Sequence, residues 1–181
     1  MRFNEVKATQ AAARLLRSRG GRMSYMKLIK LLYLADRESL SRWGRPITTD
    51  KYVSMDKGPV LSHVLDRINE ESAPDDPNFW AEHIKHAGDY CVSLGKDPGD
   101  GKLSEAEDKL LDEIFEKFGS MTRWQIVDYV HTLPEWRNPN GGALPIEYRD
   151  ILKALNKKPA DIDAIEGELE ALSEIDSLCA I

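Results

Sequence analysis

Apolar residues recur at spacings of three and four along most of the chain, which predicts a protein built mainly of helices. The strongest pattern occupies residues 24–43, where further leucines widen the apolar face on both sides. Its principal face is made by Met26, Ile29, Leu32 and Leu40. A face this wide predicts a central helix buried on more than one side. Gly44 follows and is typical of a helix C-terminus.

Six further segments have helical spacing, so we expect about seven helices in all. They are residues 3–18, 59–68, 104–118, 122–132, 145–155 and 159–178. Ser104 with Glu107, and Thr122 with Gln125, have the spacing of a capping box at a helix N-terminus. Pro59 is expected in the first turn of its helix, where the missing N–H costs nothing.

Two other segments favour extended structure. Residues 47–56 are rich in β-branched and aromatic side chains. Residues 83–94 predict a hairpin, because alternating apolar residues flank Gly88 and Asp89. The predicted fold class is therefore α+β and predominantly α-helical, with one small antiparallel β-hairpin or sheet. We expect one domain over residues 1–158, followed by an acidic C-terminal helix and tail over residues 159–181.

Length and composition suit an ordinary globular domain of 181 residues. No apolar run is long enough to cross a membrane, and the N-terminus lacks the apolar core of a signal peptide. The only two cysteines, Cys91 and Cys179, lie far apart in the sequence. Two scattered thiols indicate a reducing compartment, so we expect a cytoplasmic protein without a disulfide.

Charge is distributed unevenly along the chain. Residues 1–57 contain 13 basic and 5 acidic side chains, whereas residues 58–181 contain 12 basic and 26 acidic ones. Such asymmetry favours the steering of a charged partner. It fits equally well with two ends of the chain attracting each other within one fold, and the sequence leaves both interpretations open.

The sequence offers no convincing catalytic constellation. It contains no phosphate-binding loop, no dinucleotide-binding glycine motif, no zinc-protease motif and no serine nucleophile elbow. His83, His86 and Cys91 are the nearest approach to a metal site, but residues three apart on a strand point to opposite faces. We therefore predict that the protein is not an enzyme and has no cofactor or metal, while an unrecognised enzyme remains an alternative.

Nucleic-acid binding is a second alternative. The helix–turn–helix pattern at residues 104–132 lies among acidic residues, which would repel phosphates. One basic cluster in the N-terminal third could contact nucleic acid or an acidic protein instead. It consists of Arg14, Arg17, Arg19, Arg22, Lys27 and Lys30.

Several short motifs, in order, carry a resemblance to a known family. They are Lys27-Leu28 with Lys30-Leu31-Leu32-Tyr33, Ala35-Asp36, Gly44 with Pro46-Ile47, Asp50 with Tyr52, and Gly58-Pro59-Val60. Leu103-Ser104-Glu105, Thr122 and His131 with Trp136 extend the similarity further along the chain. Over residues 5–150 the chain resembles the Panacea domain, the family of SocA-like antitoxins and phage-associated proteins.

The resemblance implies an antitoxin that neutralises a cognate toxin by binding it directly. In the SocA branch it also implies an adaptor that delivers the toxin to the protease ClpXP. It implies no cofactor and no reaction, and it does not identify the toxin.

Candidate partner-binding residues lie on or beside the turns between residues 37 and 59. Aromatic and arginine side chains there are of the types that anchor interfaces. The candidates are Arg37, Trp43, Arg45, Asp50, Tyr52, Lys57, Gly58 and Pro59. The alternative is that the aromatic residues pack in the core and Asp50 caps a helix. The acidic C-terminal helix could form a separate contact with the toxin or a protease, or dock on its own domain.

Overall fold

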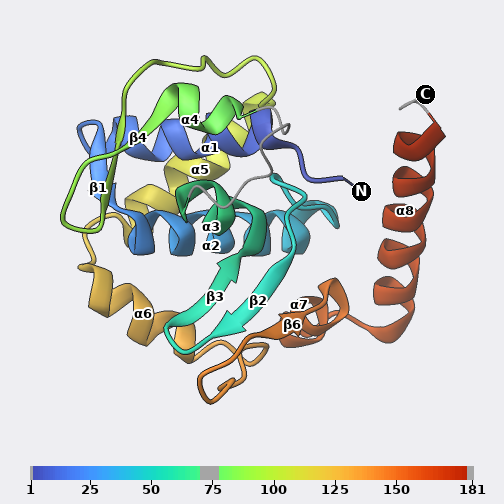
Figure 1. The fold of residues 1–181 in the computed structure, drawn as a ribbon. Coiled ribbons are helices and arrows are strands. Elements are labelled where there is room, and N and C mark those ends of the chain that lie inside the picture. Colours follow the sequence, from blue (N-terminus) through green and yellow to red (C-terminus); the bar gives the residue numbers. More distant parts are fainter. Residues whose placement is uncertain (1, 70–77, 179–181) are drawn as a thin grey trace.

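The computed structural model has the predicted α+β architecture and describes residues 2–69 and 78–178. Within those ranges the chain forms eight helices and six strands, rather than about seven helices and one hairpin (Figure 1). The helices are α1 (Glu5–Ser18), α2 (Tyr25–Trp43), α3 (Ser62–Asn69), α4 (Phe79–His83), α5 (Glu105–Phe118), α6 (Arg123–His131), α7 (Tyr148–Ala154) and α8 (Pro159–Leu178). The strands are β1 (Arg22–Ser24), β2 (Tyr52–Met55), β3 (Gly58–Leu61), β4 (Ile84–His86), β5 (Cys91–Leu94) and β6 (Leu144–Ile146).

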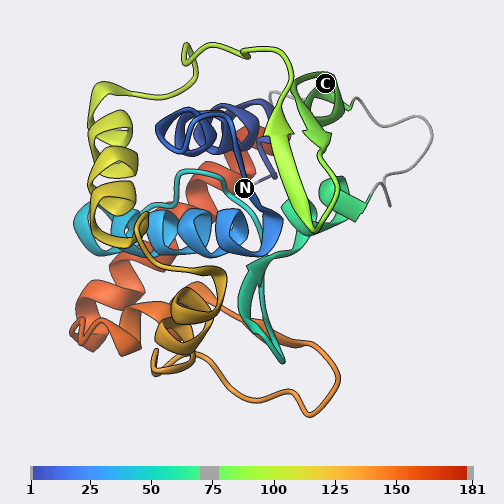
Figure 2. The ribbon, with the colours of Figure 1, turned by 90° about the vertical axis from the view of Figure 1, so that its left-hand side faces the viewer.

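Helix α2 is the centre of the molecule, as its wide apolar face predicts. Helices α1, α5, α6 and α7 and strand β3 all pack against it (Figures 1 and 2). Every residue from Lys27 to Asp36 is buried, including the polar ones. Gly44 ends the helix in the left-handed conformation at a φ of 68°. A helix enclosed on all sides must satisfy its polar side chains internally, and this requirement shapes the candidate site described below.

The predicted hairpin near residues 83–94 is confirmed. Strands β4 and β5 are antiparallel with Ile84 opposite Leu94, and β1 adds to the other edge of β5. His83 at the end of α4 is buried, and its Nδ1 lies 2.8 Å from the carbonyl oxygen of Phe79. Cys91 is a free thiol, whereas Cys179 lies outside the described residues.

The second sheet, in the order β3–β2–β6, corrects the expected helix start at Pro59. Gly58–Leu61 pairs with β2 as an antiparallel strand, and α3 begins only at Ser62. Pro59 is tolerated because β3 is an edge strand, whose outer side needs no N–H donor. The expected helix at residues 145–155 likewise divides into strand β6 and the shorter helix α7.

The two predicted capping boxes are confirmed. The Ser104 hydroxyl accepts the Glu107 N–H, while the Glu107 carboxylate accepts the Ser104 N–H at 2.9 Å. Thr122 and Gln125 exchange the same pair of bonds at the start of α6. These local bonds position α6, whose first turn contributes to the candidate site.

Charge pairing joins the two halves of the chain. Lys7 on α1 binds Glu107 at 2.6 Å, and Arg14 binds Asp112 through two bonds of 3.0 and 2.6 Å. Arg14 also lies 3.3 Å from Asp108. Part of the charge asymmetry of the sequence is thus an attraction between α1 and α5 inside one fold.

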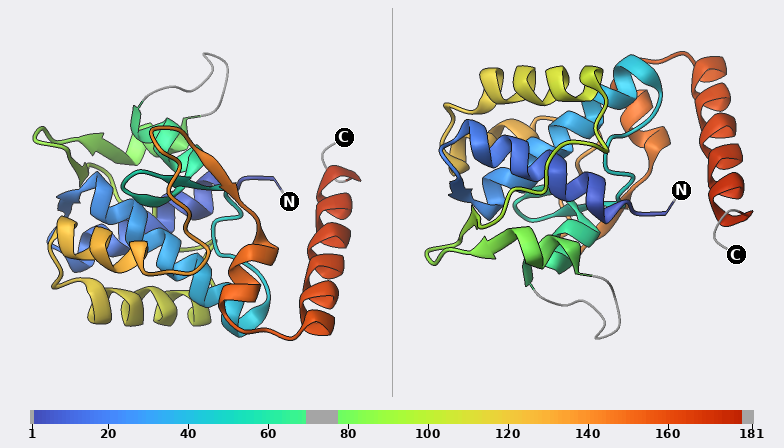
Figure 3. Two further views of the ribbon diagram at one scale, coloured as in Figure 1. Left: turned by 90° about the horizontal axis from the view of Figure 1, so that it is seen from below. Right: turned by 90° about the horizontal axis from the view of Figure 1, so that it is seen from above.

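Helix α8 begins at the predicted residue Pro159 and packs through its first half. Ile162 and Leu169 are buried, and Ile165 lies against Gly44 at the end of α2. Arg149 of α7 pairs with Asp163 and Glu166. Figure 3 shows α8 as the outermost helix, running along one flank of the molecule.

Beyond Leu169, α8 leaves its large apolar side chains in solvent. Leu172, Ile175 and Leu178 are 42%, 55% and 72% exposed. Within the described ranges, none of the helices combines the length and the apolar character that a membrane span requires.

Candidate functional site

The β2–β3 hairpin holds Lys57 at the surface in a fixed position. Met55 pairs with Gly58, so Asp56 and Lys57 form the turn between the strands. Gly58 has a φ of +92°, and a Cβ at this position would lie 2.6 Å from Cγ2 of Val130 in α6. The hairpin therefore packs too closely against α6 for any residue larger than glycine.

A groove of about 300 Å³, called the hairpin groove below, lies between this hairpin and the first half of α2. Its apolar walls are formed by Tyr25, Met26, Ile29, Met55, Val60 and Leu65. Asp56, Lys57, Gly141 and Gly142 lie at the same groove, and Lys30 is its buried basic group. Its volume is at the lower end of the range typical of ligand sites, so it suits a few side chains.

Two buried lysines on α2 have different partners, and Lys30 is the more deeply buried of the two. Lys27 donates to the carbonyl oxygens of Gly119 and Met121 at 2.6 Å each and so closes the C-terminal end of α5. Lys30 is 1% exposed and donates to the carbonyl oxygen of Pro59 at 2.7 Å. Within the described residues, Lys30 has no other hydrogen bond and no acidic partner. Burial lowers the pKa of both amines, that of Lys30 to about 7.

An exposed tryptophan stands next to Lys57 at the start of α6. Trp124 is 50% exposed, with the Arg123 guanidinium 5.2 Å and the Lys57 Nζ 5.9 Å from its ring centroid. Cations over an indole ring are favourable, and tryptophan and arginine are enriched among residues that dominate binding energy. Sequence reasoning missed Trp124, although it lies off the apolar face of its helix and this was an available signal.

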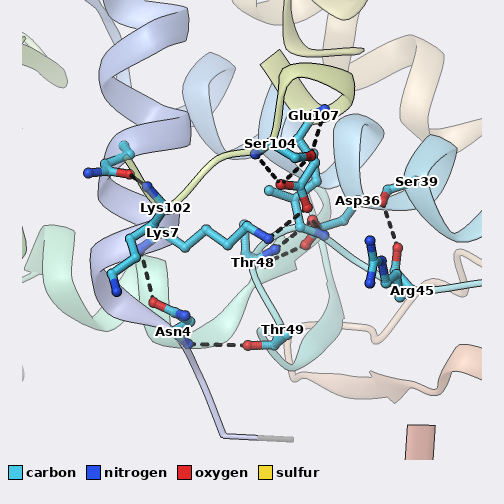
Figure 4. Close-up of polar contacts among 12 residues, drawn as sticks. Asn4, Lys7, Asp36, Ser39, Arg45, Thr48, Thr49, Lys102, Ser104 and Glu107 are labelled. Atoms are coloured by element: carbon cyan, nitrogen blue, oxygen red, sulfur yellow. Dashed lines mark hydrogen bonds and ion pairs between the residues drawn. The ribbon is translucent and has the colours of Figure 1, made fainter. Parts of the chain in front are cut away.

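Asp36 is the hub of a buried polar network, and Figure 4 shows it beside Thr48. One carboxylate oxygen accepts the backbone N–H groups of Ile47 and Thr48, at 2.8 and 3.0 Å. The other accepts the hydroxyls of Thr48 and Tyr52. Burial raises the pKa of Asp36 to about 6, although these bonds favour its charged form. The network fixes residues 47–52 to α2. Of the segment 47–56 that was expected to be extended, only Tyr52–Met55 forms a strand, and Thr49 has a φ of 55°.

Arg37 and Glu135 form a second polar link to α2. The Arg37 Nε lies 2.6 Å from the Glu135 carboxylate, which is fully buried and also accepts the Tyr33 hydroxyl at 3.0 Å. Asp50 caps α3, because its carboxylate accepts the N–H groups of His63 and Val64 at 3.0 Å each. These contacts organise the backbone around the hairpin.

The structure separates the predicted partner-binding residues into two classes. The buried ones are Asp50, Tyr52, Gly58 and Pro59, while Arg37 is half-buried. The exposed ones are Trp43, Arg45 and Lys57. Trp43 lies roughly 20 Å along α2 from Lys30, at 1.5 Å per residue. The exposed candidates therefore do not form one compact patch, and Lys57 alone among them borders the hairpin groove.

The predicted basic cluster is dispersed by the fold. Arg14 pairs with α5, Arg17 pairs with Asp97 at 2.5 Å, and Arg22 donates to the carbonyl oxygen of Ala87. Lys27 and Lys30 are buried, whereas Arg19 is exposed. In the part of the chain that the structure describes, no group of three or more His, Cys, Asp or Glu side chains could hold a metal ion.

The comparison with known families matches the segment that contains these features. The sequence model of the family described as antitoxin SocA-like, Panacea domain, matches residues 28–137. This range includes most of α2, the β2–β3 hairpin and α6, and it excludes α1 and α8. Among curated proteins and solved structures, no significant match to the chain was found.

Proposed function

The chain belongs to the family of SocA-like antitoxins with a Panacea domain, and from this we propose that it neutralises a cognate toxin protein by binding it directly. The proposed contact surface is the hairpin face, which we define as Lys57, Arg123 and Trp124 together with the hairpin groove.

The exposed Trp124 beside the groove is the observation that carries this proposal. A half-exposed indole between two cations offers a partner a large apolar area with little loss of side-chain freedom. The hairpin is held by its packing against α6 and by the Asp36 network, so the surface is ordered before binding. Such preorganisation lowers the entropic cost of association.

A protein partner suits this surface better than nucleic acid. Binding to a phosphate backbone draws on several cations that are free to contact successive phosphates. In the N-terminal basic cluster, Arg14 and Arg17 pair with acidic side chains. Lys27 and Lys30 are buried, so Arg19 and Arg22 are the exposed members of the cluster. Lys57 and Arg123 instead lie beside one aromatic ring and an apolar groove, which favours a surface of mixed character.

Co-expression with the product of the neighbouring reading frame tests the proposal. We expect that product to arrest growth when expressed alone, and the present protein to restore growth and to co-purify with it. Trp124→Ala should weaken rescue and reduce affinity at least tenfold. Trp43→Ala is the matched control, since it removes another exposed indole from the opposite end of α2. A harmless neighbour that does not co-purify, or equal effects of the two substitutions, contradicts the proposed surface.

We further propose that the protein is an adaptor that delivers the toxin to ClpXP. An adaptor must contact two proteins at once, so it needs a second surface. The exposed Leu172, Ile175 and Leu178 on the distal half of α8 supply one, on a helix that the buried Ile162 and Leu169 hold to the domain.

Deletion of residues 170–181 tests the adaptor role and keeps the docked half of α8. We expect the shortened protein to bind the toxin with unchanged affinity and to lose stimulation of toxin degradation by purified ClpXP. The full-length Leu172→Ser/Ile175→Ser variant should behave in the same way. Degradation at the normal rate in both variants would rule out this surface as the protease contact.

A further inference from the structure

We infer that Lys30 is an anchor for an acidic side chain of the bound protein, which enters the hairpin groove with its carboxylate toward the Lys30 amine. The inference rests on the proposed function in so far as the acidic side chain belongs to the toxin. Its physical basis is the unused hydrogen-bonding capacity of a buried lysine at an apolar groove.

The Lys30 amine is incompletely satisfied. A protonated lysine has three N–H donors, and one of them binds the carbonyl oxygen of Pro59. The side chain is 1% exposed, so the remaining donors have little access to bulk water. Lys27, one turn earlier, has two carbonyl partners although it is less deeply buried. Lys30 therefore has fewer hydrogen-bond acceptors than Lys27. Because Lys30 lines the groove, a ligand there could supply the missing acceptor.

Among the charged side chains at the groove, Lys30 is the one placed to bind a carboxylate. Asp56 accepts the backbone N–H of Gly141 at 2.9 Å, and Lys57 lies at the exposed turn near Trp124. His131 of α6 lies on the same side of Gly58 as the Lys30 amine, since a Cβ at Gly58 would be 3.5 Å from His131 Cδ2 and 3.4 Å from Lys30 Nζ. Its Nε2 is buried without a partner among the described residues, and its ring stacks on Trp136. A ligand that balances the unpaired positive charge at the groove would therefore be negatively charged.

The walls determine which negative group fits. Met26, Ile29 and Val60 offer apolar contact and no further donors, so a phosphate would leave most of its oxygens unsatisfied. A single carboxylate on an aliphatic stem matches one amine among the residues that line an apolar groove. Glutamate or aspartate within an apolar surface segment has this chemistry, and a volume of about 300 Å³ accommodates it.

Methionine methyl groups provide a direct probe of binding to the full-length protein. Met26 and Met55 line the groove, whereas Met23 and Met121 do not. We expect sodium hexanoate at pH 6 to shift the ¹³C-methyl resonances of Met26 and Met55 without shifting those of Met23 and Met121. Hexanol, which has the same number of carbon atoms and no charge, should bind at least fivefold more weakly.

Lys30→Leu is the matching variant, because it removes the amine and adds no methionine signal. We expect it to lose the preference for hexanoate while hexanol still shifts Met26 and Met55, which also shows that the groove is intact. Lys30→Arg retains the charge and should retain a preference for hexanoate. Equal hexanoate affinity in Lys30→Leu and wild type, or no shift at Met26 and Met55, overturns the inference.

Affinity for the toxin separates this inference from the proposed function. The hexanoate titration needs no toxin, so it decides on the carboxylate site even when the neighbouring protein does not bind. Where that protein binds wild type, we expect Lys30→Leu to lose at least tenfold in affinity. Undiminished toxin binding by Lys30→Leu would refute the anchor and leave the antitoxin proposal standing.

Discussion

Replacement of Lys30 by methionine measures the stability that the fold loses by burying an amine. Burial lowers the pKa of Lys30 from 10.5 to about 7 in the folded protein. The unfolded chain keeps the ordinary value, so it binds more protons than the folded protein between these two pH values. The free energy of unfolding therefore rises with pH across this window, and the full cost of the charged amine applies below pH 7.

The free-energy cost of the buried charge follows from the difference in pKa between the folded and unfolded chain, at about 1.4 kcal/mol for each pKa unit. Below pH 7 the buried charge costs about 5 kcal/mol, and wild type recovers about 2 kcal/mol of this between pH 7 and pH 9. Methionine has a similar shape and no charge, but it gives up the bond to Pro59, worth about 1 kcal/mol or somewhat more. At pH 7 the folded amine is about half protonated, so its cost is about 4 kcal/mol. We therefore expect the Lys30→Met variant to be about 3 kcal/mol more stable than wild type at this pH.

Urea unfolding of both proteins at pH 7 and pH 9 provides the assay. Other buried titratable groups, such as Asp36 and Tyr52, are common to both proteins and cancel in the difference. The advantage of the variant should fall by about 2 kcal/mol between the two pH values. A constant difference would mean that Lys30 titrates as an exposed lysine does, and it would refute the reasoning.

Three further substitutions test the packing around the hairpin by urea unfolding. Gly58→Ala should cost about 2 kcal/mol or more, because its Cβ would lie 2.6 Å from Val130 and its φ is +92°, and adding Val130→Ala should recover part of the loss. Asp36→Ala should cost about 3 kcal/mol, and Asp36→Asn clearly less, since the amide can still bond the same groups. Arg37→Met should cost about 3 kcal/mol by leaving the buried Glu135 carboxylate uncompensated. An effect below 0.5 kcal/mol in any of these, roughly the level of an ordinary surface substitution, would contradict the packing described here.

Local patterns predicted the parts of the fold that local forces determine. The capping boxes at Ser104 and Thr122 and the helix end at Gly44 depend on residues within a few positions of each other, and all three are confirmed. The extent of β3 could not be predicted in this way. Pro59 fits a first helical turn as well as an edge strand, and the choice depends on pairing with β2 and on burial against α2. Contacts between distant segments therefore determine that this segment is a strand and not the start of a helix.

The candidate site was less predictable than the fold, and Lys27 and Lys30 show why. Both lie in one motif on one helix, and from the sequence they resemble two members of a solvated basic cluster. The structure buries both, but it gives Lys27 two carbonyl oxygens from the turn after α5 and Lys30 one from β3. The partners of Lys27 lie more than ninety residues further along the chain. A helical pattern contains no information about what such a distant segment supplies. Lys30 becomes a candidate anchor only because the chain leaves its bonds incomplete at an open groove, and this property belongs to the assembled fold.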